Sequence, residues 1–374
     1  MLKLTSALRN GLMAFSSAAL LSLAIVPFPA LAEGKSKTAQ WHPGHYILIG
    51  PASDSKVSDW LSYSPRFRGV QIVYRWNELE PSLGNYNFSA IKRHMALAKA
   101  ANKHIWAQIQ FKGFSADPFE VCPRDLKGSP KPGGGNYSAF YAYVRNGRII
   151  RQPASWDPAV NHRLKNLLTA MGYALRSDSN ASALEGVNMP ESASGARPDD
   201  IAAQPNVLPL DKDQANNFVI QRFQTLNAAL PHTQVMQYTN AIHPTAALPN
   251  NAAMVAKEIA EGVGFGGPDL DPRRSNLVEN VYSQCALAAG KIPIGFAVQY
   301  ADTMSPGGAA DDVNDVRNTL DLAKGRKLNY VFWTNLDRYI PLVKQVLDQP
   351  ALRTDPAGGL VKTYPSAIRP LLDR

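Results

Sequence analysis

Residues 69–88 read GVQIVYRWNELEPSLGNYNF, and residues 89–101 continue with SAIKRHMALAKAA. The first seven residues are mostly β-branched, aromatic or other apolar residues, as in strands, whereas the second run has the period of an amphipathic helix. A strand followed by a helix is the unit from which parallel sheets and barrels are built. The stretch therefore predicts an α/β fold.

The strand-then-helix pattern occurs about eight times along the chain. The expected strands are 46–50, 69–75, 104–111, 184–189, 233–239, 262–265, 292–299 and 330–333. The expected helices include 89–101, 157–175, 212–230, 251–261, 275–289, 312–325 and 338–347. Ser89, Asp157 and Ser275 are expected to cap their helices, because a side-chain oxygen can accept a backbone N–H of the first turn.

Eight such units fit either an open doubly wound sheet or a closed (β/α)8 barrel. A dinucleotide-binding sheet is expected to have a glycine-rich phosphate loop after its first strand. Residues 49–54 read IGPASD, without GxGxxG or GxxxxGK[ST]. The closed TIM barrel is therefore the predicted architecture, and no cofactor is expected.

The first 32 residues have the pattern of a secretory signal peptide. Lys3 and Arg9 precede an apolar run over residues 12–27, and residues 30–32 read ALA, which fits a signal-peptidase cut. The apolar run is shorter than the roughly 20 residues that a membrane span needs. We expect residues 1–32 to be removed, leaving residues 33–374 as a single barrel domain that is periplasmic or secreted.

Charge and cysteine content argue against several other classes of protein. The formal net charge falls from +9 to +7 when Lys3 and Arg9 are removed, and no block of basic residues remains. A nucleic-acid binder would instead show a basic stripe with stacking aromatics. Cys122 and Cys285 are too few for a disulfide scaffold or a zinc cluster, and whether they pair stays open. Residues 42–45 read HPGH without carboxylate or cysteine company nearby, so no metal is expected.

The most specific motif is an Arg-Trp pair at a strand end followed by Leu-Glu-Pro-x-x-Gly-x-Tyr-x-Phe, over residues 75–88. It resembles the second strand and following loop of clan A glycoside hydrolases, the (β/α)8 enzymes that include β-galactosidases and cellulases. The matching strand count extends the resemblance over most of the chain after residue 32. The resemblance implies that Arg75 and Trp76 belong to the substrate site and that Arg75 helps to position a catalytic carboxylate, while Glu78 and Glu80 belong to the loop.

The fourth strand runs into residues 186–192, GVNMPES, where the family has an Asn-Glu pair whose glutamate is the acid/base. By this resemblance Glu191 is the general acid and Asn188 its neighbour, although here the asparagine lies three residues before the glutamate. Burial beneath long loops is expected to raise the pKa of Glu191 so that it can protonate a leaving oxygen. A salt-bridged loop residue is the alternative.

Other strand ends supply residues suited to sugars. By resemblance Trp333 in the eighth strand forms the floor of the sugar site, where an indole face matches the C–H face of a sugar ring; a core tryptophan is the alternative. Neutral hydrogen-bonding side chains follow the third, fifth and seventh strands, and we expect them to orient the sugar. They are Gln110, Tyr238, Asn240, His243 and Gln299.

The seventh strand departs from the family pattern. The family nucleophile is a glutamate at its end, whereas this chain has Gln299, and an amide cannot serve as a carboxylate nucleophile. Asp269 follows the glycine-rich segment 264–268, whose glycines let the backbone approach a ligand, and it is the expected second carboxylate. Alternatively Asp269 caps the next helix or closes a turn, and Asp302 is a weaker substitute.

Two long connections, residues 112–156 and 192–210, follow the third and fourth expected strands. Both fall on the C-terminal face, where barrel enzymes work. The first is rich in aromatic residues, which either form a wall that stacks on a ligand or pack on their own domain.

These features predict a glycoside hydrolase-like barrel that acts on an extracytoplasmic polysaccharide or oligosaccharide, with Glu191 and Asp269 as the two catalytic carboxyls. Because of Gln299, a carbohydrate-binding barrel without hydrolytic activity is the alternative. A lyase acting on acidic sugars is a third possibility.

Overall fold

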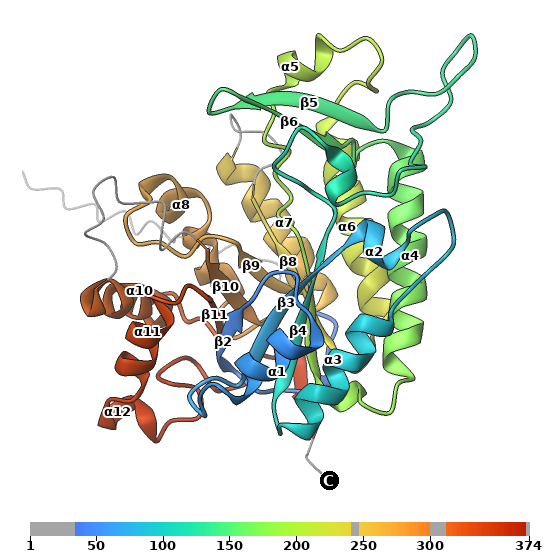
Figure 1. Ribbon diagram of the computed structural model, residues 1–374. Helices are drawn as coiled ribbons and strands as arrows, with labels where there is room; N and C mark the ends of the chain where they lie inside the picture. The colour runs from blue at the N-terminus through green and yellow to red at the C-terminus, as the bar shows by residue number, and fades with distance from the viewer. Residues whose placement is uncertain (1–33, 241–246, 300–311, 372–374) are drawn as a thin grey trace, which may run out of the picture. The chain divides into compact units, whose positions relative to one another are not determined.

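The computed structural model describes residues 34–240, 247–299 and 312–371. Within them, eight parallel strands close into a barrel in the order β10-β11-β2-β3-β4-β7-β8-β9, with helices around it (Figure 1). The predicted (β/α)8 barrel is therefore confirmed. The expected leader, residues 1–32, lies outside the described residues.

The strand bounds follow the apolar runs of the sequence closely. The barrel strands are β2 (Gly44–Leu48), β3 (Gly69–Arg75), β4 (His104–Gln110), β7 (Leu184–Met189), β8 (Gln234–Tyr238), β9 (Gly264–Gly267), β10 (Ile294–Val298) and β11 (Tyr330–Thr334). The bounds of β3 and β7 are as predicted, and the other strands differ by at most two residues at either end.

Helices connect successive strands and cover the barrel. The longer ones are α1 (Asp54–Ser62), α3 (Ser89–Ala100), α4 (Pro158–Arg176), α6 (Lys212–Ala229), α7 (Ala247–Glu261), α10 (Val313–Gly325) and α11 (Ile340–Leu347). The shorter ones are α2 (Trp76–Leu79), α5 (Pro198–Ala202), α8 (Ser275–Asn280), α9 (Cys285–Ala288) and α12 (Pro350–Arg353). The single helix expected over 275–289 is thus divided, with a 3-10 turn between α8 and α9.

One of the three predicted helix caps is confirmed. Asp157 accepts hydrogen bonds from the backbone N–H groups of Ala159 and Val160 at the start of α4. The caps predicted at Ser89 and Ser275 are wrong, because each serine is already the first helical residue.

The barrel interior is filled by large side chains packed against glycines. Tyr46, Trp106, Met236, Tyr330 and Phe332 belong to one buried cluster, separate from the larger core between strands and helices. A β-carbon at Gly186 would lie 2.3 Å from the Trp106 ring, and one at Gly295 would lie 2.8 Å from Met236. Glycine at these positions therefore makes room for the large interior side chains.

The first long connection folds into an antiparallel hairpin of β5 (Phe140–Arg145) and β6 (Arg148–Pro153). Its turn residues Asn146 and Gly147 have φ angles of 51° and 73°, as a type I′ turn requires. Gln204, in the second long connection, exchanges two hydrogen bonds with the backbone of Ala142. Figure 1 shows the hairpin beyond one end of the barrel, so the two connections together build a wall there.

The two ends of the described chain meet at the other end of the barrel. Strand β1 (Lys37–Ala39) pairs in parallel with β12 (Ile368–Pro370) in a separate two-stranded sheet. Cys122 and Cys285 are both buried and free, so they do not form a disulfide.

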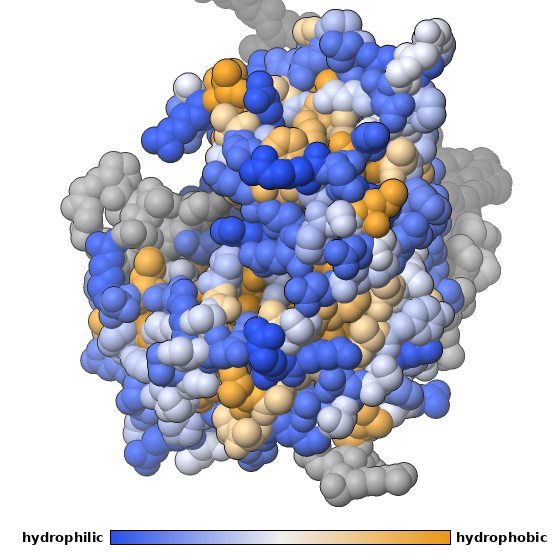
Figure 2. Space-filling model, turned by 45° about the vertical axis from the view of Figure 1, so that its right-hand side comes forward, coloured by the Kyte–Doolittle hydropathy of each residue, from blue (hydrophilic) through white to orange (hydrophobic). Residues whose placement is uncertain are grey.

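The surface seen in Figure 2 is largely hydrophilic, with small apolar patches scattered over it. Among the described residues, no helix combines the length and apolar character needed to cross a bilayer.

Candidate active site

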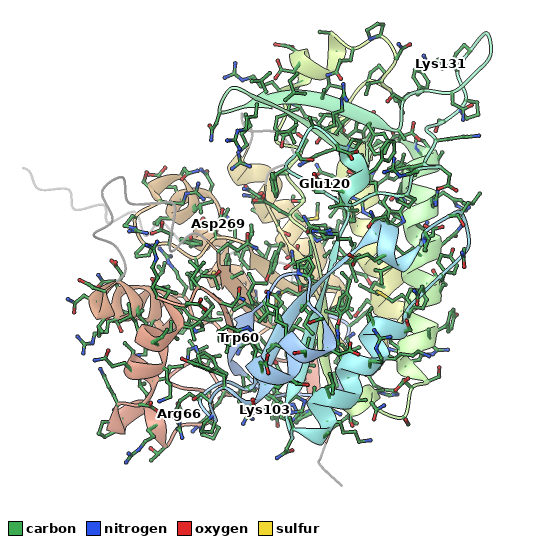
Figure 3. All side chains as sticks on the ribbon, viewed as in Figure 1. Trp60, Arg66, Lys103, Glu120, Lys131 and Asp269 are labelled. Atoms are coloured by element: carbon green, nitrogen blue, oxygen red, sulfur yellow. The ribbon has the colours of Figure 1, made fainter. Side chains whose placement is uncertain are left out.

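A pocket lies at the C-terminal ends of the barrel strands, under the β5–β6 hairpin. Its lining comes from the ends of β4 and β8, the segments after β7, β9 and β10, and the hairpin itself. It holds about 670 Å³ of empty space, including the part open to solvent. In Figure 3, Asp269 lies toward this end of the barrel, whereas Arg66 and Lys103 lie at the opposite end.

Asp269 lines the pocket directly after β9. Its Oδ2 accepts a hydrogen bond of 2.7 Å from Arg274, and its buried Oδ1 has no hydrogen-bond partner within the described part of the chain. Burial and, next, the negative charge of Glu191 raise the pKa of Asp269 to about 7, although Arg274 and Arg145 lower it in part. Arg274 rather than Asp269 occupies the cap position of α8. A carboxyl group with this pKa is suited to proton transfer near neutral pH.

Glu191 lines the same pocket from the segment after β7. Its Oε1 accepts a hydrogen bond of 2.7 Å from the Asn240 side chain, just past β8. The buried ammonium of Lys112 donates to the backbone carbonyls of Glu191 and Ala193, and burial lowers the pKa of Lys112 to about 7. The segment that carries Glu191 is therefore fixed from two neighbouring strand ends.

Three other predicted residues, Gln110, Tyr238 and Gln299, also line the pocket. Gln108, two residues before Gln110 in β4, also lines the pocket. Its buried Oε1 has no hydrogen-bond partner among the described residues. The pocket thus offers amide groups, and two of its lining residues, Gln108 and Asp269, each have an acceptor oxygen without a hydrogen-bond partner among the described residues.

Asn188 and Arg75 lie close to the pocket but do not line it. Asn188 is fully buried inside the barrel, where its Oδ1 accepts a 2.9 Å hydrogen bond from Gln71, which also donates to the Tyr238 hydroxyl. Arg75 ends β3 directly beside Gln110 of β4. Asn188 therefore supports the floor under Tyr238, and Arg75 stands at the correct end of the barrel.

The structure places Trp76 and Trp333 in the core rather than in the substrate site. Both are fully buried, with indole N–H groups that donate to Glu80 and His45, respectively. Trp333 belongs to the core between strands and helices, whereas its neighbour Phe332 belongs to the barrel interior. Because side chains alternate along a strand, the residue after an interior position cannot form the pocket floor. The predicted sugar-binding roles of Trp76 and Trp333 are therefore not supported by their placement, and His243 lies outside the described residues.

The glycines of β9 serve packing rather than approach to a ligand. A β-carbon on Gly266 would lie 2.0 Å from the carbonyl oxygen of Gly295, and one on Gly267 would lie 2.8 Å from the Phe296 ring. The interpretation drawn from the sequence was wrong on this point, since the close neighbours are other strands.

Sequence reasoning missed the basic residues of the pocket. Lys112 comes immediately after the predicted third strand, and this position was the available signal for a residue on the C-terminal face. Arg145 gave no such signal, because its place depends on how the hairpin folds over the barrel. The connection over residues 112–156 was expected to use its aromatic residues either as a wall beside a ligand or in packing, and both occur. Phe114 and Tyr143 line the pocket, whereas Tyr141 packs against Trp156 in the core.

One group with metal-ligand spacing is found among the described residues, at the N-terminal end of the barrel. It consists of His42, His104 and Glu185. The Glu185 carboxylate already accepts hydrogen bonds from the His42 ring and backbone, Gln234 and Tyr330. The two imidazole rings are stacked 3.6 Å apart, a geometry in which their nitrogen lone pairs do not converge. These contacts favour a hydrogen-bonded structural network over a metal site.

The comparisons with known proteins identify the fold. No protein-family model and no curated protein matches the sequence. The exo-β-1,4-mannosidase Op5Man5 from Opitutaceae bacterium strain TAV5 matches with a TM-score of 0.50 and 14% identity, over 83% of this chain and 56% of its own. A GH5_18 protein from Streptomyces cattleya in complex with GlcNAc matches with a TM-score of 0.52 and 14% identity, over 87% and 80% of the two chains.

The catalytic domain of a β-amylase from Paenibacillus polymyxa matches with a TM-score of 0.52 and 8% identity, over 82% of this chain and 98% of that domain. This chain therefore spans little more than half of the mannosidase but almost all of the β-amylase domain. At these identities the matches establish the shared barrel architecture. The resemblance to (β/α)8 glycoside hydrolases is confirmed at that level.

Proposed function

We propose that this protein hydrolyses glycosidic bonds of an extracytoplasmic polysaccharide or oligosaccharide. One observation carries the proposal: Glu191 and Asp269, from different strand ends, line one pocket, and the charge of Glu191 raises the pKa of Asp269. A pair of carboxyl groups with different protonation states is the minimum for acid/base cleavage of a glycosidic bond.

In this proposal the roles of the two carboxyls are the reverse of those expected from the sequence, in which Glu191 is the general acid and Asp269 the second carboxylate. Asp269, with its pKa of about 7, holds a proton at near-neutral pH and donates it to the leaving glycosidic oxygen. Glu191, oriented by Asn240, takes a proton from the water that attacks the anomeric carbon as the bond to the leaving oxygen breaks. One water is consumed, and Asp269 regains its proton from Glu191 through solvent.

The polar lining of the pocket supports a carbohydrate substrate. Amide groups from Gln108, Gln110 and Gln299 converge there with the Tyr238 ring, which suits a ligand rich in hydroxyls. Two solved barrels of the same fold are named as a mannosidase and a β-amylase, which agrees with this assignment. The leader pattern in residues 1–32 supports export of the protein.

The test is the release of reducing ends from a panel of bacterial and plant polysaccharides by the purified protein and its Asp269→Asn and Glu191→Gln variants. We expect each substitution to lower kcat by at least about 100-fold, because each removes one partner of the proton transfer. The control is Glu279→Gln, which removes an exposed carboxylate from α8 and should leave kcat unchanged. Equal activity of all four proteins would disprove the proposed carboxyl pair.

A carbohydrate-binding barrel without turnover is the second candidate, favoured by Gln299 in the pocket. It predicts that the unmodified protein binds an oligosaccharide, by calorimetry, without releasing any reducing end. It also predicts that Asp269→Asn binds as tightly as the unmodified protein.

A further inference from the structure

The β5–β6 hairpin presents one of its faces to the pocket. Tyr143, Arg145 and Gln152 line the pocket, and Arg148 is the direct cross-strand partner of Arg145. Cross-strand partners point to the same side of a hairpin, so Arg148 lies on the pocket side as well. The opposite face carries Arg151 and the exposed Val144–Ile149 pair.

The pairing of Arg145 with Arg148 is unfavourable for the hairpin itself. Like charges directly opposite each other in an antiparallel pair destabilise it. Residues 140–153 contain three arginines and no acidic residue, so the hairpin supplies no carboxylate of its own to offset the repulsion. A binding partner with negative charge would offset it.

Arg145 also lies within electrostatic reach of Asp269. Its charge lowers the pKa of Asp269 in part, and its guanidinium stacks 5.4 Å from the centre of the Phe114 ring. Phe114 lines the pocket and is 58% exposed. The pair therefore forms an aromatic platform with a cation beside it, on the wall opposite the strand ends.

Among the described residues that line the pocket, Arg145 is the cation with an exposed side chain. Lys112 is buried and bound to two backbone carbonyls, and Asp269 is already paired with Arg274. A guanidinium suits carboxylate and sulfate groups because its N–H groups match two anionic oxygens at once.

We propose that the hairpin forms a subsite for a sugar unit that carries an anionic group, a carboxylate or a sulfate, with Arg145 as the main contact and Arg148 in support. This proposal rests on the proposed function, because it names the substrate class of the same pocket.

The test compares matched acidic and neutral ligands. Oligogalacturonides are set against their methyl esters, and sulfated chondroitin oligosaccharides against desulfated ones, by calorimetry and by product release. The unmodified protein should bind one of the two acidic ligands about tenfold or more tightly than its neutral partner, since a charge-assisted contact is lost in the latter. Which pair shows the preference distinguishes carboxylate from sulfate.

Arg145→Gln and the double variant Arg145→Gln/Arg148→Gln should lose that preference, with the affinity for the neutral ligand changed less than about twofold. Arg151→Gln is the matched control, because it removes the same charge from the other face of the same hairpin. Thermal melting of all variants checks that the fold is kept. Equal binding of acidic and neutral ligands by the unmodified protein, or equal losses in Arg145→Gln and Arg151→Gln, would overturn the subsite.

Failure of the proposed function gives a different result. Selective binding of the acidic ligand without any product would refute hydrolysis and leave the subsite standing. An unsaturated product, seen by its ultraviolet absorbance, would replace hydrolysis by elimination at the same subsite.

Discussion

At the scale of single residues, the pKa of Asp269 depends on groups that can be removed one at a time. Burial is the largest cause of the raised pKa, and the charge of Glu191 is the next. In Glu191→Gln the pKa of Asp269 should therefore fall from about 7 but stay above 3.8, and in Arg274→Met it should rise. Carbon-detected NMR titration of the aspartate carboxyls measures both shifts.

The matched control for this titration is Glu279→Gln, in which an exposed carboxylate on α8 is removed and the pKa of Asp269 should not move. The same titration bears on activity, since the acid form of Asp269 is lost as the pH rises above about 7. In Arg274→Met the alkaline limb of the pH–rate profile should therefore shift to higher pH, together with the pKa of Asp269. An unchanged pKa in Glu191→Gln would contradict the coupling of the two carboxyls.

At the scale of elements, the sequence predicted the strands well and the faces of individual side chains less well. Apolar runs located every barrel strand to within two residues, and Glu191 and Asp269 follow from the rule that barrel sites lie at strand ends. Trp333 was misplaced because a shift of one residue along a strand exchanges the interior for the helix layer. The place of Arg145 in the pocket could not be predicted from the sequence, because it depends on how the β5–β6 hairpin folds over the barrel.

The hairpin depends on its turn, and Gly147 is its most sensitive position. Gly147 has a φ of 73°, and a β-carbon there would meet no atom within 4 Å. Gly147→Val should therefore act through backbone strain alone and cost about 1–2 kcal/mol of hairpin stability. Hydrogen exchange over residues 140–153 should speed up, and kcat/KM should fall, while the melting of the barrel changes little.

Asn146→Gly is the matched variant for this turn, because glycine adopts the observed φ of 51° without strain. Its exchange rates in the hairpin and its kcat/KM should stay close to those of the unmodified protein. Full activity of Gly147→Val with a disordered hairpin would show that the pocket does not need the hairpin.

At the scale of the whole molecule, the two ends of the barrel have different tasks. The C-terminal end holds the pocket, where burial and the charge of Glu191 disfavour the ionised form of Asp269. The N-terminal end holds a hydrogen-bonded network, in which Glu185 of β7 accepts hydrogen bonds from groups of β8, β11 and the segment before β2. Hydrogen bonds of this kind connect strands that are distant in sequence, so the network contributes to closure of the barrel.

The pH dependence of stability tests that contribution. Burial alone would raise the pKa of Glu185, but hydrogen bonds and charge from His42, with the charge of His104, outweigh it and lower the pKa from 4.5 to about 2. A lowered pKa means that the ionised form stabilises the fold above pH 4.5, and that this stabilisation is lost as the pH falls through about 2. The shift corresponds to about 3 kcal/mol of unfolding free energy.

Glu185→Gln should remove this free energy at neutral pH, because an amide cannot carry the charge that the histidines stabilise. Urea unfolding of both proteins from pH 7 to pH 2 measures the difference between their free energies of unfolding. This difference should be largest above pH 4.5 and should decrease toward pH 2. Glu120→Gln, at an exposed carboxylate, serves as the control and should follow the unmodified protein throughout. A gap that stays constant with pH would mean that Glu185 acts through packing and not through its charge.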